Sequence, residues 1–357
     1  PFSIIFELSI APTSPYGVIL QARNGHETIF SVSYIDFQSE DSSFINLVYG
    51  DKDTGIPIYN AIVWQDIRTT DICEDLKNKN LDKEISNKTG LLIGPYFSAT
   101  KISWILNNVK SAKERAKSGK LLFGTIDSWL IWNLTDKQTH ATDFSNASRT
   151  MLYNINKLEW DSDILNELDI PKSMLPKVLN SSANFGNFNY KGHKIPIYGV
   201  LGDQQASLFG QKCFDETSTK NTYGTGCFML MNTEEKIIKS KNGLLSTIAW
   251  GINGKICYAL EGSIFIAGAG IQWLRDEMGI INSSEESEEH ALKSSDKSNL
   301  FVVPAFNGLG APHWDMYATG LIIGITRDTN KSDIIKATLD SIAYQTKDVM
   351  LSMEKDS

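Results

Sequence analysis

Apolar and polar residues alternate in the first part of the chain with the period of two that is typical of strands. Three short alternating runs lie between residues 3 and 32, with turn-forming residues between them. Asn24 and Gly25 form a strong hairpin-turn signal before the third run. We therefore predict an antiparallel meander over residues 3–37.

Helical spacing of the apolar positions begins further along. Residues 69–88 are charged and helical in pattern, and residues 96–108 predict an amphipathic helix with a cap near Ser98 or Thr100. The same spacing predicts a long closing helix over residues 332–353.

Three stretches between these helices differ in character. Residues 62–66 predict a strand that ends in polar side chains, which is a favourable place for ligand contacts. Residues 123–132 predict a helix whose two tryptophans belong to the core. Residues 142–150 are polar and rich in capping residues, and we expect a loop with a role in a site.

The most informative stretch is residues 195–211. Residues 195–201 are apolar and β-branched, which predicts a buried strand, and Gly202 ends this run. Asp203 then begins a short amphipathic segment. Its carboxylate is suited to capping a helix, and it is equally suited to chemistry at the carboxyl end of a strand. The position alone favours the cap, and the rest of the chain reverses that preference.

Small residues mark two turns in the second half. Gly224, Thr225 and Gly226 separate two strand-like runs, as in a plain hairpin, although such a turn also lets backbone N–H groups approach a phosphate. Gly268 and Gly270 open a helical segment. This arrangement is consistent with close helix packing and with a helix N-terminus that faces a nucleotide.

The other patterns of the second half are simpler. Residues 244–260 predict a hairpin around Asn253 and Gly254. Residues 283–297 are acidic and polar, and we expect an exposed connection. Residues 301–314 predict a strand that continues into a loop rich in glycine and proline.

Composition narrows the class of protein. The chain has 357 residues, enough for two domains, and we place the division after residue 211, giving domains 1–211 and 212–357. A net charge of −8 without a basic tract argues against binding nucleic acid, and no apolar stretch approaches the roughly 18 residues of a membrane span. The four cysteines are widely spaced, which favours reduced thiols and a cytoplasmic location.

Several motifs together resemble the FGGY carbohydrate kinases. Residues 96–108 (YFSATKISWILNN) are similar to the family's first signature, and GLIIGI at residues 320–325 with the residues after it is similar to the second. GDQQ at residues 202–205, TYGTGCFMLMNT at 222–233 and GLGAPHWD at 308–315 resemble the glycerol-phosphorylating members more narrowly. The matches cover residues 56–357.

The resemblance implies an α/β fold of two actin-like (ribonuclease H-like) lobes that close on the substrate and Mg-ATP. Asp203 is similar to the general base that takes the proton from a glycerol hydroxyl. The substrate side is implied to include Trp64, Tyr96, Gln204 and the apolar wall Phe228. The ATP-side positions that match are Thr225, Gly268 and Gln272. Mg²⁺ is implied to bridge the phosphates largely through water. The sequence does not identify protein ligands for Mg²⁺, and it is compatible with a homo-oligomer.

The sequence also departs from the family. The first phosphate loop of the family has no counterpart in residues 7–16, and residues 42–46 replace the stretch whose Arg and Glu hold glycerol. The family's glycine-rich adenine-binding segment has no counterpart after the last helix, so the second lobe is expected to be incomplete. Because unmatched polar groups cost about 1–3 kcal/mol each, we expect weak or no turnover.

Three hypotheses follow. The first is an ATP-dependent glycerol kinase, or a kinase for another small polyol. The second is a non-catalytic paralogue that retains the fold as a binding or regulatory module, and the third is a fragment or damaged copy of a kinase gene. Retention of Asp203 favours the first hypothesis.

Overall fold

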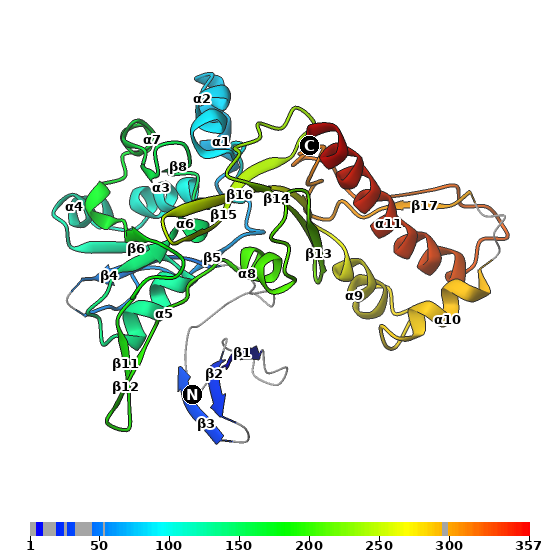
Figure 1. Cartoon of the computed structure of the whole chain (residues 1–357). Coiled ribbons are helices and arrows are strands. Elements are labelled where there is room, and N and C mark those ends of the chain that lie inside the picture. Colours follow the sequence, from blue (N-terminus) through cyan, green and yellow to red (C-terminus); the bar gives the residue numbers. More distant parts are fainter. Residues whose placement is uncertain (1–4, 10–18, 25–26, 33–44, 53, 295–298) are drawn as a thin grey trace.

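The computed structural model describes residues 5–9, 19–24, 27–32, 45–52, 54–294 and 299–357 (Figure 1). The first three strands form an antiparallel sheet in sequence order, comprising β1 (Ile5–Ser9), β2 (Ile19–Asn24) and β3 (Glu27–Val32). The predicted meander is therefore confirmed within these residues, whereas Gly25 lies outside the described part of the chain.

The first α/β unit is built around β4 (Ile45–Asp51), which pairs antiparallel with both β5 (Ile62–Val63) and β6 (Leu121–Thr125). Helix α5 (Ile126–Leu134) follows β6 directly. The predicted helix over residues 123–132 was therefore wrong for its first three residues. The run Leu121–Thr125 is apolar and almost completely buried, and periodicity does not distinguish such a short run from a buried helix segment.

Four helices lie between β5 and β6 in the chain: α1 (Thr70–Asn78), α2 (Asp82–Thr89), α3 (Ser98–Asn108) and α4 (Ala112–Lys117). They confirm the helical pattern of residues 69–88 and 96–108. The predicted cap of α3 was wrong, because Phe97 occupies the cap position and no side chain caps the helix. Ser98 is instead the first helical residue, and its side chain faces the cavity described below.

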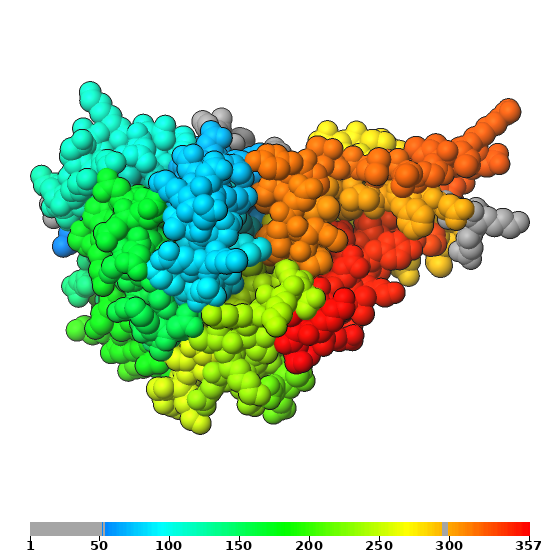
Figure 2. Space-filling view, turned by 90° about the horizontal axis from the view of Figure 1, so that it is seen from above, coloured from blue at the N-terminus to red at the C-terminus, as the bar shows by residue number. Residues whose placement is uncertain are grey.

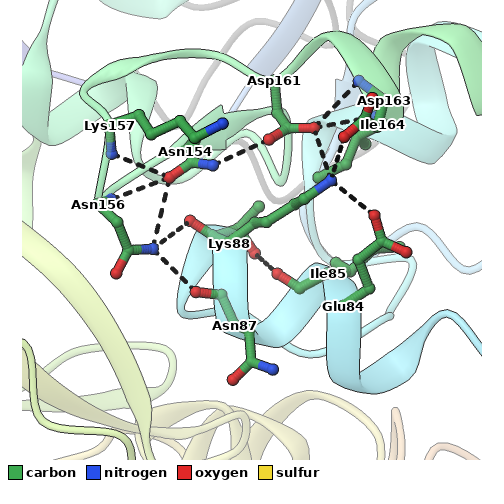
Figure 3. Close-up of polar contacts among 11 residues, drawn as sticks. Glu84, Ile85, Asn87, Lys88, Asn154, Asn156, Lys157, Asp161, Asp163 and Ile164 are labelled. Carbon is green, nitrogen blue, oxygen red and sulfur yellow. Dashed lines mark hydrogen bonds and ion pairs between the residues drawn. The ribbon is translucent and has the colours of Figure 1, made fainter.

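A polar network joins α2 to Asn154 of β8 (Tyr153–Asn154) and to the start of α7 (Ser162–Glu167), which follows β9 (Glu159–Trp160) (Figure 3). The Lys88 ammonium lies 2.6 Å from a carboxylate oxygen of Glu84, 3.2 Å from Asp161 and 2.6 Å from Asp163. Asp161 also accepts hydrogen bonds from the first amides of α7. One lysine thus joins three carboxylates from two helix termini.

A parallel pair follows, formed by β7 (Ala141–Asp143) and β10 (Lys177–Leu179), with α6 (Phe144–Ala147) and the 3-10 turn Lys172–Met174 between them. Asp143 caps α6 by accepting hydrogen bonds from the backbone N–H groups of Ser145 and Asn146. The predicted loop at residues 142–150 is therefore a capped helix turn, which holds its side chains in fixed positions.

The predicted buried strand at residues 195–201 was wrong. Strand β12 (His193–Pro196) ends early and pairs with β11 (Asn187–Tyr190) in a hairpin, and residues 197–202 belong to no strand. Ile197 and Val200 bond through their amides to the backbone of residues 186 and 181, but no ladder forms and Tyr198 is 60% exposed. An apolar run becomes a buried strand only where tertiary neighbours cover both of its faces.

The second half is built on a four-stranded antiparallel sheet with the order β13-β14-β16-β15. Its strands are β13 (Thr219–Tyr223), β14 (Cys227–Glu234), β15 (Leu245–Ile252) and β16 (Lys255–Ile264), and α8 (Asp203–Gly210) and α9 (Gly268–Asp276) flank them. The predicted hairpin around Asn253 and Gly254 is confirmed, and both residues have the positive φ that such a turn requires.

The C-terminal segment contains α10 (Glu286–Lys293), the antiparallel pair β17 (Phe301–Val303) and β18 (Leu321–Ile323), and the long helix α11 (Lys331–Asp356). The closing helix is confirmed, and it begins with a capping box formed by Asn330 and Asp333. The expected connection at residues 283–297 was wrong in part, because α10 forms within it and packs on α11.

The largest core cluster crosses between the two halves of the chain. Ile102 and Ile105 of α3 belong to the same cluster as Leu245 and Ile248 of β15. Figure 2 shows the cyan and green elements in contact with the yellow-green sheet, which in turn contacts the orange and red C-terminal segment. Among the described residues, no helix is both long and apolar enough to span a bilayer.

Candidate active site

A small cavity, open to solvent, lies where the two halves of the chain meet. Its walls come from the end of β5, the start of α3, the β6–α5 junction, α6 and the residues after it, the start of α8, and β16. The lining residues are Trp64, Tyr96, Ser98, Thr125, Ile126, Asn146, Arg149, Gly202, Asp203, Gln204, Gln205 and Glu261.

Four of the five predicted substrate-side residues line this cavity: Trp64, Tyr96, Asp203 and Gln204. The fifth, Phe228, does not line it. Its ring packs edge-on against Trp64 with a centroid distance of 6.0 Å, so it supports the wall from behind. The tertiary structure therefore gathers residues that are up to 164 positions apart in the sequence (Trp64 to Phe228).

Aromatic rings form the apolar wall of the cavity. Trp64 meets Tyr96 edge-on at 5.5 Å between ring centroids. The buried Lys101 ammonium holds this wall from below, because it donates to the backbone carbonyl of Val63 at 2.6 Å and to that of Tyr96 at 3.5 Å. Burial lowers the pKa of Lys101 to about 7. Lys101 was not among the predicted site residues.

Asp203 is the first residue of α8, and Gly202 occupies the cap position without a side-chain cap bond. The capping interpretation is therefore wrong, and the carboxylate is exposed toward the cavity. Gln204 donates from its side-chain amide to the Oδ2 atom of Asp203 at 2.8 Å. Crowding by surrounding protein raises the pKa of the Asp203 carboxyl, while the hydrogen bonds from Gln204 and the charge of Lys220 oppose this rise.

Arg149 and Glu261 form an ion pair at the base of the cavity. The Nη2 atom of Arg149 lies 2.7 Å from the Oε1 atom of Glu261, and Ser263 donates to the same oxygen at 2.7 Å. One further nitrogen of Arg149, Nη1, and the second carboxylate oxygen of Glu261, Oε2, are buried and have no hydrogen-bond partner among the described residues. Buried polar atoms are normally hydrogen-bonded, so these two atoms indicate a polar ligand or water.

The sequence assigned no specific role to either member of this pair. Arg149 was in the polar loop expected to have a role in a site, and Glu261 lies directly after the predicted hairpin of residues 244–260. A charged residue inside an otherwise apolar strand was the one available indication, because unpaired carboxylates are rarely buried.

The residues predicted for the ATP side lie on a second unit. The turn Gly224–Gly226 joins β13 to β14 and packs against the start of α9, where a Cβ on Gly268 would lie 2.6 Å from the carbonyl oxygen of Gly224. The amides of Ala267 and Ala269 donate to the Thr225 carbonyl, and the amide of Gly268 donates to that of Gly224.

Close helix packing therefore explains the glycine at position 268. The amides that would face a phosphate at this helix start are already bonded to the turn. The side chains of Thr225 and Gln272 remain at least partly accessible on this unit, and they do not line the cavity.

The departures at the N-terminus fall mostly outside the described residues. Residues 10–16 and 42–44 are not described, and the side chains of residues 7–9 and 45–46 are not described either. The structure therefore does not test those expectations.

Comparison with known proteins gives matches over nearly the whole chain. The models for the N-terminal and C-terminal domains of the FGGY family of carbohydrate kinases match residues 35–210 and 219–357. A glycerol kinase of Caldanaerobacter subterraneus subsp. tengcongensis is 62% identical over 87% of this chain and 63% of its own length. A glycerol kinase of Thermoanaerobacter sp. (strain X514) is 62% identical over 96% of this chain and 68% of its own length.

Solved structures agree with these matches. The Plasmodium falciparum glycerol kinase with ADP has a TM-score of 0.77 and 39% identity, covering 87% of this chain and 62% of that chain. A xylulose kinase from Lactobacillus acidophilus, at 24% identity with a TM-score of 0.71 over 86% of this chain and 62% of its own, shares the fold. The chain spans 63% of the length of the Caldanaerobacter relative, slightly under two thirds.

Proposed function

Because the chain belongs to the FGGY family of carbohydrate kinases, we propose that its cavity binds glycerol and that Asp203 is the base for phosphoryl transfer from ATP. The product is sn-glycerol 3-phosphate. The observation that carries the proposal is the convergence of an accessible carboxylate, an aromatic wall and two unpartnered buried polar atoms in one cavity.

The chemistry of the cavity suits a small polyol. Trp64 and Tyr96 offer an apolar surface for a carbon backbone, and Arg149 Nη1 and Glu261 Oε2 offer a donor and an acceptor for hydroxyl groups. A hydroxyl group both donates and accepts, so one polyol satisfies both atoms. The relatives named as glycerol kinases favour glycerol over other polyols.

Asp203 acts on the hydroxyl that becomes phosphorylated. Its carboxylate accepts the hydroxyl proton as the oxygen bonds to the γ-phosphorus and ADP leaves. Its place at the start of α8 favours the ionised form, because the helix dipole stabilises a negative charge there. Gln204 holds one carboxylate oxygen, which fixes the side chain toward the cavity.

For the nucleotide, we propose the side chains of Thr225 and Gln272 as contacts, with Gly268 as the residue that lets the start of α9 pack closely against the turn. Mg²⁺, when bound, neutralises charge on the phosphates. Among the described residues, no three His, Cys, Asp or Glu side chains gather in a metal-binding group, so we propose that phosphates and water supply most of its ligands.

Turnover of glycerol with Mg-ATP, followed by coupled ADP formation, tests the proposal. We expect slow but glycerol-dependent turnover, because residues 7–16 do not resemble the family's first phosphate loop. Asp203→Asn should lower kcat by about 100-fold or more, since it removes the general base at nearly constant shape. Asp75→Asn, at an exposed position of α1, is the matched control and should leave kcat unchanged.

Two outcomes contradict parts of this proposal. Glycerol binding by calorimetry without any turnover would favour the non-catalytic binding module. A folded chain that neither binds glycerol nor turns it over would reject the glycerol assignment, and a panel of other polyols would then identify the substrate class.

The cytoplasmic location remains a prediction from the cysteine spacing.

A further inference from the structure

Lys220 is a buried lysine for which the proposed chemistry gives no role. It is the second residue of β13, it is 5% exposed, and it does not line the cavity. Its ammonium donates to the side-chain oxygen of Gln204, to the hydroxyl of Thr222 at 2.9 Å and to the backbone carbonyl of Phe228 at 3.2 Å. These three acceptors use all three donors of the ammonium.

The contact with Gln204 fixes the orientation of that side-chain amide. An ammonium only donates, so the amide oxygen of Gln204 faces Lys220. An ionised carboxylate only accepts, so the amide nitrogen faces Asp203, where it donates to Oδ2 at 2.8 Å. The two hydrogen bonds therefore require the same orientation of the Gln204 amide. Exchanging its oxygen and nitrogen would break the bonds to both Lys220 and Asp203.

The contact with Phe228 reaches the aromatic wall. The carbonyl that Lys220 holds belongs to the residue whose ring supports Trp64 at 6.0 Å. Lys220 thus joins the start of α8, which carries Asp203, to the strand that supports the wall. One buried cation therefore contacts a cavity-lining residue, Gln204, and the backbone of Phe228, whose ring packs on Trp64.

The charge of Lys220 also acts on Asp203. Crowding raises the pKa of the Asp203 carboxyl and Glu261 on β16 raises it further, whereas Gln204 and Lys220 lower it. Arg149 and Tyr96 also interact electrostatically with Asp203. Burial lowers the pKa of Lys220 itself to about 8, against the opposing negative charges of Glu261 and Asp203. Lys220 is therefore mostly protonated at pH 7 and loses its charge as the pH rises through 8.

We propose that Lys220 is a positioning residue for Asp203: its ammonium holds the Gln204 amide that orients the carboxylate, and it places a positive charge directly behind that amide. The inference deepens the proposed function, since it assumes that Asp203 is the base. The hydrogen bond between Lys220 and Gln204 then serves the reaction as well as the packing of β13.

The first test measures the ionisation of Asp203 directly and needs no turnover. The chain is labelled with ¹³C at the aspartate carboxyl groups, and the spectrum of Asp203→Asn identifies the Asp203 signal. Lys220→Met keeps a similar length and removes the charge and the donors. We expect it to raise the titration midpoint of Asp203 by about one pH unit. An unchanged midpoint in folded Lys220→Met would overturn the proposal.

Two further variants control for shape and for net charge. Lys220→Arg retains the charge and should keep the midpoint within a few tenths of a unit of the wild-type value. A midpoint in Lys220→Arg as high as in Lys220→Met would show that packing is responsible rather than charge. Lys236→Met removes an exposed lysine that pairs with Glu216 on the surface, and it should leave the midpoint unchanged.

Kinetics provide the second test. Lys220→Met should lower kcat about 10-fold near pH 6.5, with a smaller change in the KM for glycerol, and should move the acidic limb of the pH profile upward. Gln204→Met should add little to Lys220→Met, because the two residues act in series. If the wild type shows no turnover, the proposed function fails, and the titration of Asp203 still decides the role of Lys220.

Discussion

At the residue scale, the buried polar side chains near the cavity have specific partners. Asp127, at the start of α5, accepts hydrogen bonds from the hydroxyls of Thr125 and Thr142, and Thr125 lines the cavity. Asp127 is only 8% exposed, and this burial raises its pKa to about 6 despite the two hydroxyl donors. The folded chain therefore favours the protonated form of the Asp127 carboxyl up to about pH 6.

Asp127 predicts a pH dependence of stability. Its pKa is about 6 in the folded chain and 3.8 in a model compound, so the native state binds the extra proton between those values. The stability that it contributes is complete below pH 3.8 and is lost as the pH rises through 6. Asp127→Asn should remove this loss.

Urea unfolding at pH 4 and pH 7 measures the effect. The free energy of unfolding of Asp127→Asn relative to the wild type should be higher at pH 7 than at pH 4, by on the order of 2–3 kcal/mol. Asp75→Asn at an exposed position serves as the control. The prediction would be contradicted if the free energy of unfolding of Asp127→Asn, relative to the wild type, changed between pH 4 and pH 7 by no more than that of Asp75→Asn.

At the element scale, helix α2 depends on contacts with other elements more than on its own sequence. It has eight residues, a length at which isolated helices are unstable in water. The Lys88 side chain is 20% exposed, and its contacts with Asp161 and Asp163 lie on a different element (Figure 3). The network therefore supplies the tertiary contacts that keep α2 in place.

Lys88→Met should destabilise the chain by about 1–3 kcal/mol, because it leaves the Asp161 carboxylate, which is 5% exposed, without its cation. Lys83→Met on the same helix is the matched control, since Lys83 is exposed. Urea unfolding gives the free energies, and amide exchange should show faster exchange in α2 for Lys88→Met alone. Equal destabilisation by both variants would argue against the network.

At the scale of the whole molecule, the two halves of the chain share one core and approach each other through backbone. Gly90 ends α2 with a φ of +75°, and its carbonyl accepts a hydrogen bond from the amide of Ser246 at 2.9 Å. A Cβ at position 90 would lie 2.2 Å from the backbone oxygen of Ser246 on β15. The predicted division after residue 211 stays a prediction, and contacts of this kind cross it.

A pair of glycines separates backbone strain from this close approach. Gly119 has a φ of +70°, and a Cβ there would meet nothing within 4 Å. Gly119→Ala should cost about 1 kcal/mol, the price of a left-handed alanine. Gly90→Ala should cost at least about 2 kcal/mol more, because the two halves must also move apart. Thermal unfolding of both variants measures the loss of stability. Equal losses in the two variants would contradict the prediction, because they would mean that the backbone at Ser246 moves away from the new Cβ at little cost.

Elements whose pattern is local could be predicted from the order of residues alone. The closing helix α11, the amphipathic α3 and the hairpin around Asn253 and Gly254 were all predictable, because periodicity and turn chemistry act over a few residues. The motifs also determined the family, and they selected Trp64, Tyr96, Asp203 and Gln204, which the structure places in one cavity.

Features that depend on distant neighbours became visible once the chain was folded. Residues 195–201 have the pattern of a buried strand, yet most of their backbone has no ladder partner. Phe228 supports the cavity wall without lining it, and Arg149 meets Glu261 across 112 positions of sequence. Lys220 has no local signal at all. A buried charge is tolerated only where partners from other elements surround it, and no sequence pattern states which elements those are.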